Sequence, residues 1–329
     1  MTAAPGGPTL VTGATGFVGS AVVRQLLARG AAVRILRRPA SRLDLLGAAA
    51  AHVEHALGDV TDLASVLDAT AGCRAVVHCA AAVAFGPGAR AALRRVNVAG
   101  TAHVVDACLA NGVARLAHTS SIAALGRTAA GSGAPLDESA VWTPSPANTA
   151  YAVSKHDAEL EVLRGVAEGL DAVLVNPAVI FGPGRPGENT MALVERVARG
   201  VPAAPAGGTA VVDVEDVAAG LLAALDRGAP GARYVLAAEN LPWTEILGTL
   251  ARALGAPPPR RTVPPRVLVA AGALAELGGL LGLEPSLTRE TARTASRQDR
   301  YSADRARREL GLTFRPFAET ARRIAAARS

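Results

Sequence analysis

Apolar positions along the chain alternate between short runs typical of strands and longer stretches with helical spacing. The first run, from Thr9 to Thr12, leads through a glycine-rich turn into apolar residues at helical spacing that reach Leu27. Apolar strands that alternate with amphipathic helices predict an α/β fold with a doubly wound parallel sheet. Further strands are expected at 31–38, 52–60, 75–81, 115–121 and 172–180, and helices at 63–70, 96–112 and 151–169.

The regular alternation stops near residue 181, where proline and glycine become frequent. A helix and a strand within 210–240 repeat the earlier pattern and are expected to rejoin the first sheet. We therefore expect a sheet domain over 1–181 that 210–240 completes. Segments 182–209 and 241–329 are expected to form a smaller, mainly helical part that binds the substrate.

Composition narrows the function classes. The net charge is +6, but the arginines are scattered among acids and aromatic residues make up only 3% of the chain. Nucleic-acid binding is not expected, because bases would find few stacking platforms. The most apolar late stretch, 267–283, carries Glu276 and is too short to span a bilayer.

The cysteines and the first residues bear on the compartment. The chain has three cysteines without paired spacing, and its first residues lack the pattern of a signal peptide. We expect a cytoplasmic protein with reduced thiols. The cysteines are Cys73, Cys79 and Cys108.

Three glycines follow the first strand and open the first helix. Gly13 permits a tight turn, Gly16 lets the backbone approach a pyrophosphate, and Gly19 allows close packing of the helix. The helix N-terminus then offers free N–H groups and a positive dipole to phosphates. The sheet domain is therefore expected to be a dinucleotide-binding Rossmann domain.

The end of the second strand bears on the choice of nucleotide. Many dinucleotide folds carry an acid there that binds a ribose hydroxyl, whereas this chain carries Arg37 and Arg38. Guanidinium groups bind a 2′-phosphate that a carboxylate would repel. NADP(H) is therefore favoured as the cofactor, and NAD(H) stays possible because both arginines could be solvated surface residues.

The chain contains a single lysine, Lys155, four residues after Tyr151. In a helix this spacing places the two side chains on one face, one turn apart. A phenol of ordinary pKa is a poor proton shuttle at neutral pH, and a nearby ammonium is expected to lower the pKa of Tyr151. The pair predicts acid/base chemistry.

Three hydroxyl residues end the strand at 115–121. A serine at the carboxyl end of a parallel strand could donate a hydrogen bond to a substrate carbonyl. The strand pattern does not choose among Thr119, Ser120 and Ser121.

Taken in order, these motifs resemble the extended short-chain dehydrogenase/reductase family. The matching pieces are TGATGFVG, GDVTD, VVHCAA, VNVAGT, HTSSIAALG, YAVSK, NPAVIFGPG and VVDVEDVAAG, which span residues 9–220. The tail resembles the subgroup of dihydroflavonol 4-reductase-like and 3β-hydroxysteroid dehydrogenase-like proteins.

The resemblance implies a role for each matching residue. Ser121 would be the catalytic serine, Tyr151 the acid/base and Lys155 its partner on the nicotinamide ribose, whereas Asn97 is expected to be structural. The implied cofactor contacts are Gly13, Thr15, Gly16, Phe17, Val18, Gly19, Asp59, Val60, Ala80, Ala81, Ser120, Tyr151, Lys155 and Pro177.

Three functions compete on this fold. The favoured one is an NADPH-dependent reductase of a ketone or aldehyde in a fairly apolar substrate. An NAD-dependent nucleotide-sugar epimerase or dehydratase is the alternative, weakened because the stretch AGGTAVVDVEDVAAG lacks an arginine for a sugar diphosphate. A non-catalytic NADP sensor is the third, disfavoured because the Tyr151–Lys155 pair is intact.

Other features point less clearly to function. His52 and His55 lack a third ligand, so no metal site is expected. Trp142 could line the substrate entrance or anchor the surface. The family resemblance implies a possible homodimer through helices at 91–111 and 151–168. Substrate specificity is expected to depend on 84–92, 127–147, 182–209 and 241–290.

Overall fold

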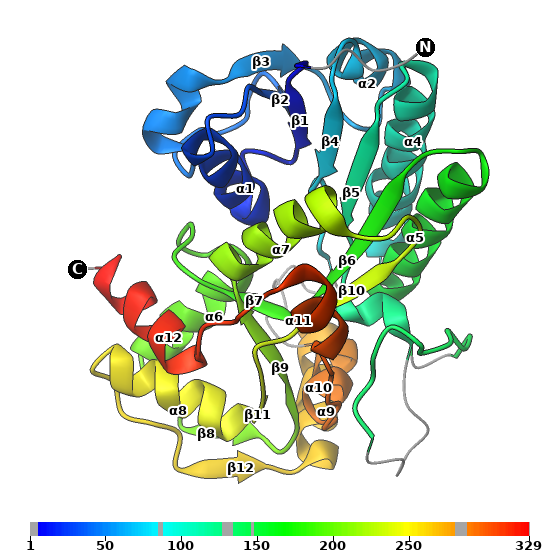
Figure 1. Cartoon of the computed structure of the whole chain (residues 1–329). Helices are drawn as coiled ribbons and strands as arrows, with labels where there is room; N and C mark the ends of the chain where they lie inside the picture. The colour runs from blue at the N-terminus through cyan, green and yellow to red at the C-terminus, as the bar shows by residue number, and fades with distance from the viewer. Residues whose placement is uncertain (1–5, 85–87, 127–133, 146–147, 280–287, 329) are drawn as a thin grey trace.

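The computed structural model describes residues 6–84, 88–126, 134–145, 148–279 and 288–328. Its largest element is one parallel sheet, which confirms the predicted fold class (Figure 1). The order of strands reverses between β1 and β4, the kind of switch point beside which ligands bind in open α/β sheets. Across the sheet lie β3 (Glu54–Leu57), β2 (Val33–Arg37), β1 (Thr9–Thr12), β4 (Ala75–His78), β5 (Arg115–Thr119), β6 (Ala172–Pro177) and β10 (Arg233–Leu236).

Helices cover both faces of this sheet, because successive strand side chains point to opposite sides. In β1, Val11 belongs to the apolar cluster under the helices α1 (Phe17–Ala28) and α7 (Val214–Arg227). Leu10 belongs to the cluster on the other face. The helices that cover that face are α2 (Leu63–Thr70), α4 (Gly100–Ala110) and α5 (Ala150–Ala167).

The helix expected at 96–112 has an irregular beginning. The short helix α3 (Ala89–Leu93) leads into the π-helical segment η2 (Arg94–Ala99), which continues into α4. A 3-10 turn, η3 (Ile122–Leu125), follows β5, and another, η1 (Gly47–His52), precedes β3. Wider helical turns often occur at functional sites, and η2 lies close to α5.

The smaller part of the protein is mainly helical, as predicted. The helices α6 (Asn189–Ala198), α8 (Trp243–Ala253) and α12 (Phe317–Ala326) share one apolar cluster. It also holds two small sheets that the sequence did not predict. These are β7 (Val179–Phe181), β9 (Gly208–Asp213) and β11 (Glu239–Pro242), and β8 (Ala203–Pro205) with β12 (Arg261–Val263).

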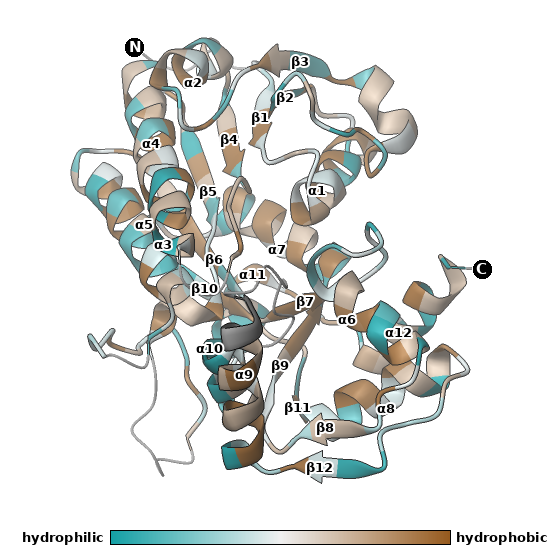
Figure 2. Ribbon diagram, turned by 180° about the vertical axis from the view of Figure 1, so that it is seen from behind, coloured by the Kyte–Doolittle hydropathy of each residue, from teal (hydrophilic) through white to brown (hydrophobic). Residues whose placement is uncertain are grey.

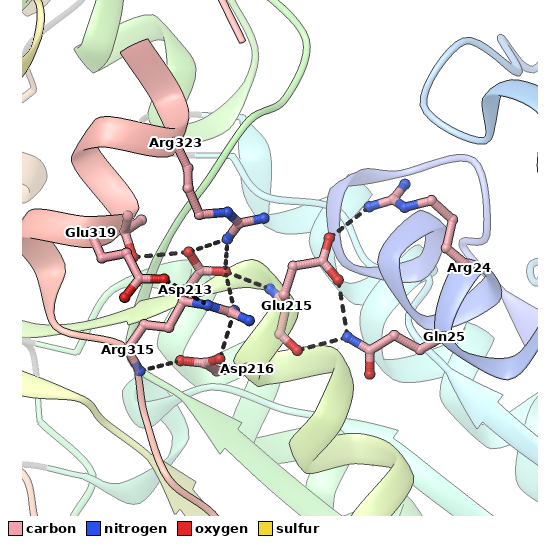
Figure 3. Close-up of polar contacts among 9 residues, drawn as sticks. Arg24, Gln25, Asp213, Glu215, Asp216, Arg315, Glu319 and Arg323 are labelled. Carbon is pink, nitrogen blue, oxygen red and sulfur yellow. Dashed lines mark hydrogen bonds and ion pairs between the residues drawn. The ribbon is translucent and has the colours of Figure 1, made fainter. Parts of the chain in front are cut away.

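A buried carboxylate joins the small part to the sheet domain. Asp213 caps α7 by accepting a hydrogen bond from the backbone N–H of Glu215 at 2.8 Å. Both oxygens of Asp213 accept hydrogen bonds from Arg323 of α12, at 2.7 and 2.6 Å (Figure 3). Glu215 in turn accepts from Arg24 and Gln25 of α1, at 2.9 and 3.0 Å. One polar network thus ties α12 and α7 to the helix that begins at the glycine turn.

Three further helices complete the small part: α9 (Pro265–Gly279), α10 (Arg289–Ala295) and α11 (Asp304–Leu310). Figure 2 shows α9 and α10 side by side below the main sheet. No helix among the described residues is long and apolar enough to cross a bilayer. Parts of the stretches expected to set specificity, in 84–92, 127–147 and 241–290, lie outside the described residues.

Candidate active site

Two of the three glycines in the turn, Gly13 and Gly19, occupy places that a larger residue would not fit. Gly13 has a φ of +65°, and a Cβ there would lie 2.6 Å from the backbone nitrogen of Ala80. A Cβ on Gly19 would lie 2.2 Å from the carbonyl oxygen of Gly13. Gly16 caps α1 without a side-chain hydrogen bond, so the first N–H groups of the helix are not occupied by a capping side chain. This cradle fits the pyrophosphate of a nicotinamide dinucleotide.

The other residues implied as cofactor contacts lie at the carboxyl ends of neighbouring strands. Ala80 and Ala81 follow β4, and the Ala80 N–H donates to Thr12 Oγ1 at 3.2 Å. Asp59 and Val60 follow β3, and Pro177 ends β6. The fold therefore brings residues from distant parts of the sequence to the same edge of the sheet as the glycine turn. Their roles in binding stay predictions.

Arg37 and Arg38 have different surroundings at the end of β2. The guanidinium of Arg37 donates to His55 Nδ1 at 2.8 Å and to the carbonyl of Arg38 at 3.3 Å. The side chain of Arg38 is 73% exposed and lies 4.0 Å from Asp59. Arg38 is therefore the more accessible of the two for a 2′-phosphate.

One residue that no sequence motif indicated contacts the glycine turn from the small part. Arg185, in the loop between β7 and α6, donates to the carbonyl of Thr15 at 2.8 Å. The same guanidinium contacts both oxygens of Asp44, each at 2.9 Å from Nε. Asp44 lies in the segment after β2, so Arg185 links the two loops next to the expected nucleotide site. The FGPGRPGE run gave no periodic signal that could identify this contact.

Tyr151 lies at the first turn of α5 and is half-buried. A hydrogen bond joins it to Ser121, the serine whose hydroxyl also accepts from the N–H of Ala123 at 3.2 Å. Burial raises the pKa of Tyr151, and the hydrogen bond with Ser121 opposes that rise. The expectation that Lys155 lowers this pKa is therefore wrong for this structure, because burial outweighs the stabilisation of the phenolate.

Lys155 lies one turn after Tyr151, fully buried against the sheet. Its ammonium donates to the carbonyl oxygen of Thr119 at 2.7 Å. Burial lowers the pKa of Lys155 to about 8, while the charge of Glu159 raises it. The ammonium is thus fixed at the carboxyl end of β5. Ser121 lies two residues after this end of the strand.

The hydroxyl of Ser120 contacts a side chain of α5. It donates to Glu159 at 2.5 Å, and Glu159 also accepts from the side-chain amide of Asn176 at 2.6 Å. No motif in the sequence pointed to Glu159 or Asn176. Glu159 could have been found, because it lies four residues after Lys155 on the same face of α5.

Two further residues have contacts that bear on the earlier predictions. Asn97 of η2 bonds both backbone groups of Ala82, at 2.7 and 3.0 Å, and donates to Ser154 at 3.0 Å. This arrangement agrees with a structural role. Trp142 stacks on His156 of α5 with ring centroids 4.3 Å apart, which anchors the segment before Tyr151 to its helix.

The doubly wound sheet, the glycine cradle and the Ser121–Tyr151–Lys155 cluster define a dinucleotide-dependent enzyme of the extended short-chain dehydrogenase/reductase type. A family model described as the NAD dependent epimerase/dehydratase family matches residues 9–237, and the chain belongs to that family. It is an NAD(P)-dependent oxidoreductase of this type.

Similar proteins support this assignment over nearly the whole chain. The chain is 37% identical to sterol demethylase protein B of Methylococcus capsulatus, over 92% of this chain and 93% of that protein. It is 36% identical to a putative dihydroflavonol 4-reductase of Synechocystis, over 92% and 89%. The crystal structure of gox2253 superposes with a TM-score of 0.83 at 34% identity, covering 97% of each chain. The resemblance seen in the sequence is confirmed.

Proposed function

We propose that the protein is an NADPH-dependent carbonyl reductase and alcohol dehydrogenase that acts reversibly on a fairly apolar ketone or aldehyde. The observation that carries this proposal is the hydrogen bond between Tyr151 and Ser121, with Lys155 buried one turn further along α5. A proton donor and a carbonyl-polarising hydroxyl are thereby held together at the edge of the sheet that carries the glycine cradle.

In this mechanism each of the three residues has one task. Ser121 donates a hydrogen bond to the carbonyl oxygen and stabilises the negative charge that develops there. Tyr151 supplies the proton to that oxygen, and its raised pKa keeps the phenol protonated until the oxygen becomes basic. The ammonium of Lys155 would hold ribose hydroxyls of the bound nucleotide, and its positive charge stabilises the phenolate that remains after Tyr151 has given up its proton. The nicotinamide, when bound, supplies the hydride or accepts it in the reverse direction.

The preference for NADP(H) rests on Arg38. Its exposed guanidinium follows the end of β2 and is available to bind a 2′-phosphate, although Asp59 is also near, at 4.0 Å. NAD(H) is the alternative. Measured affinities for NADPH and NADH, with Arg38→Ala and the exposed Arg90→Ala as variant and control, separate the two. A loss of affinity for NADPH alone in Arg38→Ala supports the proposal, and equal losses contradict it.

An apolar substrate is favoured by composition and by the named relatives. The relative from Methylococcus carries sterol in its name, and the one from Synechocystis is named as a reductase of dihydroflavonol. We propose that 182–209 and 241–329 bind the substrate, with 1–181 and 210–240 binding the nucleotide. The three free cysteines favour a cytoplasmic location.

Epimerisation or dehydration of a nucleotide sugar is the second candidate, because the matching family model also describes such enzymes. The strand β9 and the start of α7 read GTAVVDVED and lack an arginine for the diphosphate. A non-catalytic sensor of NADP is weaker still, since the Tyr151–Lys155 pair is present.

We also propose a homodimer that forms through α4 and α5. Apolar side chains are exposed along α5 at Val153, Leu160 and Leu163. Their spacing places them on one side of the helix, where a second copy of the chain could cover them.

Turnover of a carbonyl panel tests the proposed function. Absorbance at 340 nm is followed with NADPH and with aromatic ketones, aldehydes, dihydroflavonols and 3-ketosteroids. Tyr151→Phe is expected to reduce kcat by about 10²–10⁴-fold, the usual contribution of an acid/base residue, with NADPH affinity preserved. Turnover that survives in Tyr151→Phe, or tightly bound NAD+ without turnover of any carbonyl, would overturn the proposal.

A further inference from the structure

Glu159 is a buried carboxylate that the mechanism above does not use. It lies one turn after Lys155 on α5 and is 2% exposed. One oxygen accepts from Ser120 Oγ at 2.5 Å and from Asn176 Nδ2 at 2.6 Å. The other lies 3.7 Å from Arg233 of β10. Burying a carboxylate this deeply costs free energy unless hydrogen bonds and a nearby positive charge compensate for the lost hydration.

The contacts of Glu159 reach the turn that carries Ser121. Asn176 donates to Glu159 and, from the same nitrogen, to the backbone carbonyl of Ser121 at 3.0 Å. Ser120 is bound to Glu159 directly, and its N–H donates to the carbonyl of Val175 at 2.7 Å. Ser120 and Ser121 are thus both held in place. The groups that hold them are the carboxylate of Glu159 and the side-chain amide of Asn176. Without that carboxylate, Ser120 and Asn176 would each lose a buried acceptor.

The charge of Glu159 also acts on Lys155. Burial lowers the pKa of Lys155 to about 8, and Glu159 is the first of the groups that oppose this effect. The strands packed against Lys155 carry three further titratable groups. Burial shifts the pKa of each in the direction that favours its neutral form. They are His78, with a pKa of about 3, Cys79, with a pKa of about 11, and His118, whose pKa lies well below its ordinary value.

We propose that Glu159 is a positioning residue with two linked tasks: its charge keeps Lys155 an ammonium, and its hydrogen bonds fix the Ser120–Ser121 turn against Tyr151. The importance of these tasks for turnover rests on the proposed function, since Lys155 and Ser121 are given their roles there. A purely structural Glu159, held as the partner of Arg233, would leave the titration of Lys155 unchanged.

The single lysine of the chain allows a direct test. Protein labelled with ¹³C at the lysine Cε carbon gives one side-chain signal, which belongs to Lys155. The signal is followed by NMR from neutral to alkaline pH without added nucleotide, in the full chain and in Glu159→Gln. Glutamine keeps an oxygen acceptor for Ser120 and Asn176 but removes the charge. The pKa of Lys155 is expected to fall by about one, a tenfold change in proton affinity.

A matched control lies two residues further along the same helix. Glu161 is paired with Arg164 at 2.9 Å on the outer side of α5. Glu161→Gln also removes one negative charge but is expected to leave the pKa of Lys155 unchanged. A pKa in Glu159→Gln equal to that of the wild type overturns the proposal, and so does an equal change in both variants.

A second variant keeps the test decisive if Glu159→Gln does not fold. Glu159→Asp retains the charge but withdraws it by one methylene, so the pKa of Lys155 is expected to fall by a smaller amount. A fall as large as the one expected for Glu159→Gln overturns the proposal, because the retained charge would then have no effect on Lys155.

Kinetics then separate this inference from the proposed function. The alkaline limb of the kcat profile in Glu159→Gln is expected to move to lower pH by the amount that the NMR titration gives. If the lysine titration shifts but Tyr151→Phe retains turnover, the reductase mechanism fails and the charge effect of Glu159 stands. If Tyr151→Phe is inactive and the titration does not shift, the inference fails alone.

Discussion

At the scale of single residues, burial decides the protonation states around the site. Burial raises the pKa of Tyr151 and lowers that of Lys155, so it favours the neutral form of both. The phenol of Tyr151 is therefore protonated at neutral pH, which agrees with the role of proton donor that we propose for carbonyl reduction. The charge of Glu159 offsets part of the effect of burial on the pKa of Lys155.

The same burial predicts acid sensitivity through two neighbouring histidines. His78 and His118 lie on adjacent strands with ring centroids 5.1 Å apart. His78 bonds Thr12 and Thr101, whereas no hydrogen-bond partner for either ring nitrogen of His118 lies among the described residues. Burial lowers the pKa of His78 to about 3 and that of His118 well below its ordinary value.

The sign of the effect follows from the unfolded chain. An unfolded histidine gains its proton near pH 6.5, while the folded protein resists protonation until much lower pH. Stability is therefore complete above about pH 6.5 and is lost as the pH falls, by about 1.4 kcal/mol per pH unit for each such histidine. His118→Leu is expected to reduce this slope.

Urea unfolding at pH 7, 6 and 5 measures the slope. His52→Leu is the control, because His52 is exposed on η1 and its loss should leave the slope as in the wild type. Parallel stability curves for the wild type and His118→Leu would contradict the prediction.

At the scale of elements, α7 serves as the link between the small part and the glycine turn. Its N-terminus is capped by Asp213, which is fully buried and bonded to Arg323, Thr320 and Arg315. Loss of one partner leaves a buried carboxylate with fewer charges around it. The attachment of α12 to the end of β9 and the cap of α7 therefore depends on side chains more than a hundred residues apart in sequence.

Arg323→Met is expected to destabilise the protein by about 2 kcal/mol. This figure is below the 3–5 kcal/mol typical of a broken buried ion pair, because Arg315 remains and Arg323 is partly exposed. Chemical denaturation measures the loss. Arg322→Met, which changes the exposed neighbour on α12, is expected to have little effect. Equal stability of the two variants would show that the Asp213 network contributes nothing.

Much of the sheet domain was predictable because its elements have strong local periodicity. The strand Thr9–Thr12 and the helix over 63–70 lie where the apolar pattern placed them. The small strands β8, β9 and β11 were not predicted, because each contains a proline or a glycine and they lie where the alternation of apolar strands and helices has stopped. The π-helical start of the 96–112 helix was also missed, since wider turns have no distinct apolar pattern.

The candidate site was predictable only where residues lie in local motifs. The spacing of Tyr151 and Lys155 and the three glycines follow from helix and turn geometry. Contacts across elements, such as Asn176 to Glu159 and Arg185 to Thr15, depend on strand register and loop path. The pKa of Tyr151 was predicted with the wrong sign because sequence shows a nearby charge but not how deeply the phenol is buried.

At the scale of the whole molecule, the site faces away from the surface that we propose for dimerisation. Tyr151 and Lys155 lie on the side of α5 that packs on the sheet, whereas Leu160 is 51% exposed on the same helix. A dimer through α4 and α5 would therefore bury apolar area without covering the carboxyl edge of the sheet. It would also support α5, the helix that carries Tyr151 and Lys155, on the face that points away from the sheet.

Light scattering coupled to gel filtration tests this assembly. The wild type is expected to have the mass of two chains, and Leu160→Asp the mass of one, because an interface cannot bury an unpaired carboxylate cheaply. Leu274→Asp is the matched control, since Leu274 is 70% exposed on α9, outside the proposed interface. A single-chain mass for the wild type, or monomers from both variants, would contradict the α4–α5 dimer. If dimerisation limits the motion of α5, the monomeric Leu160→Asp variant is expected to keep its affinity for the nucleotide and to lose part of its kcat. The reason is that this variant loses only the contacts on the outer face of the helix.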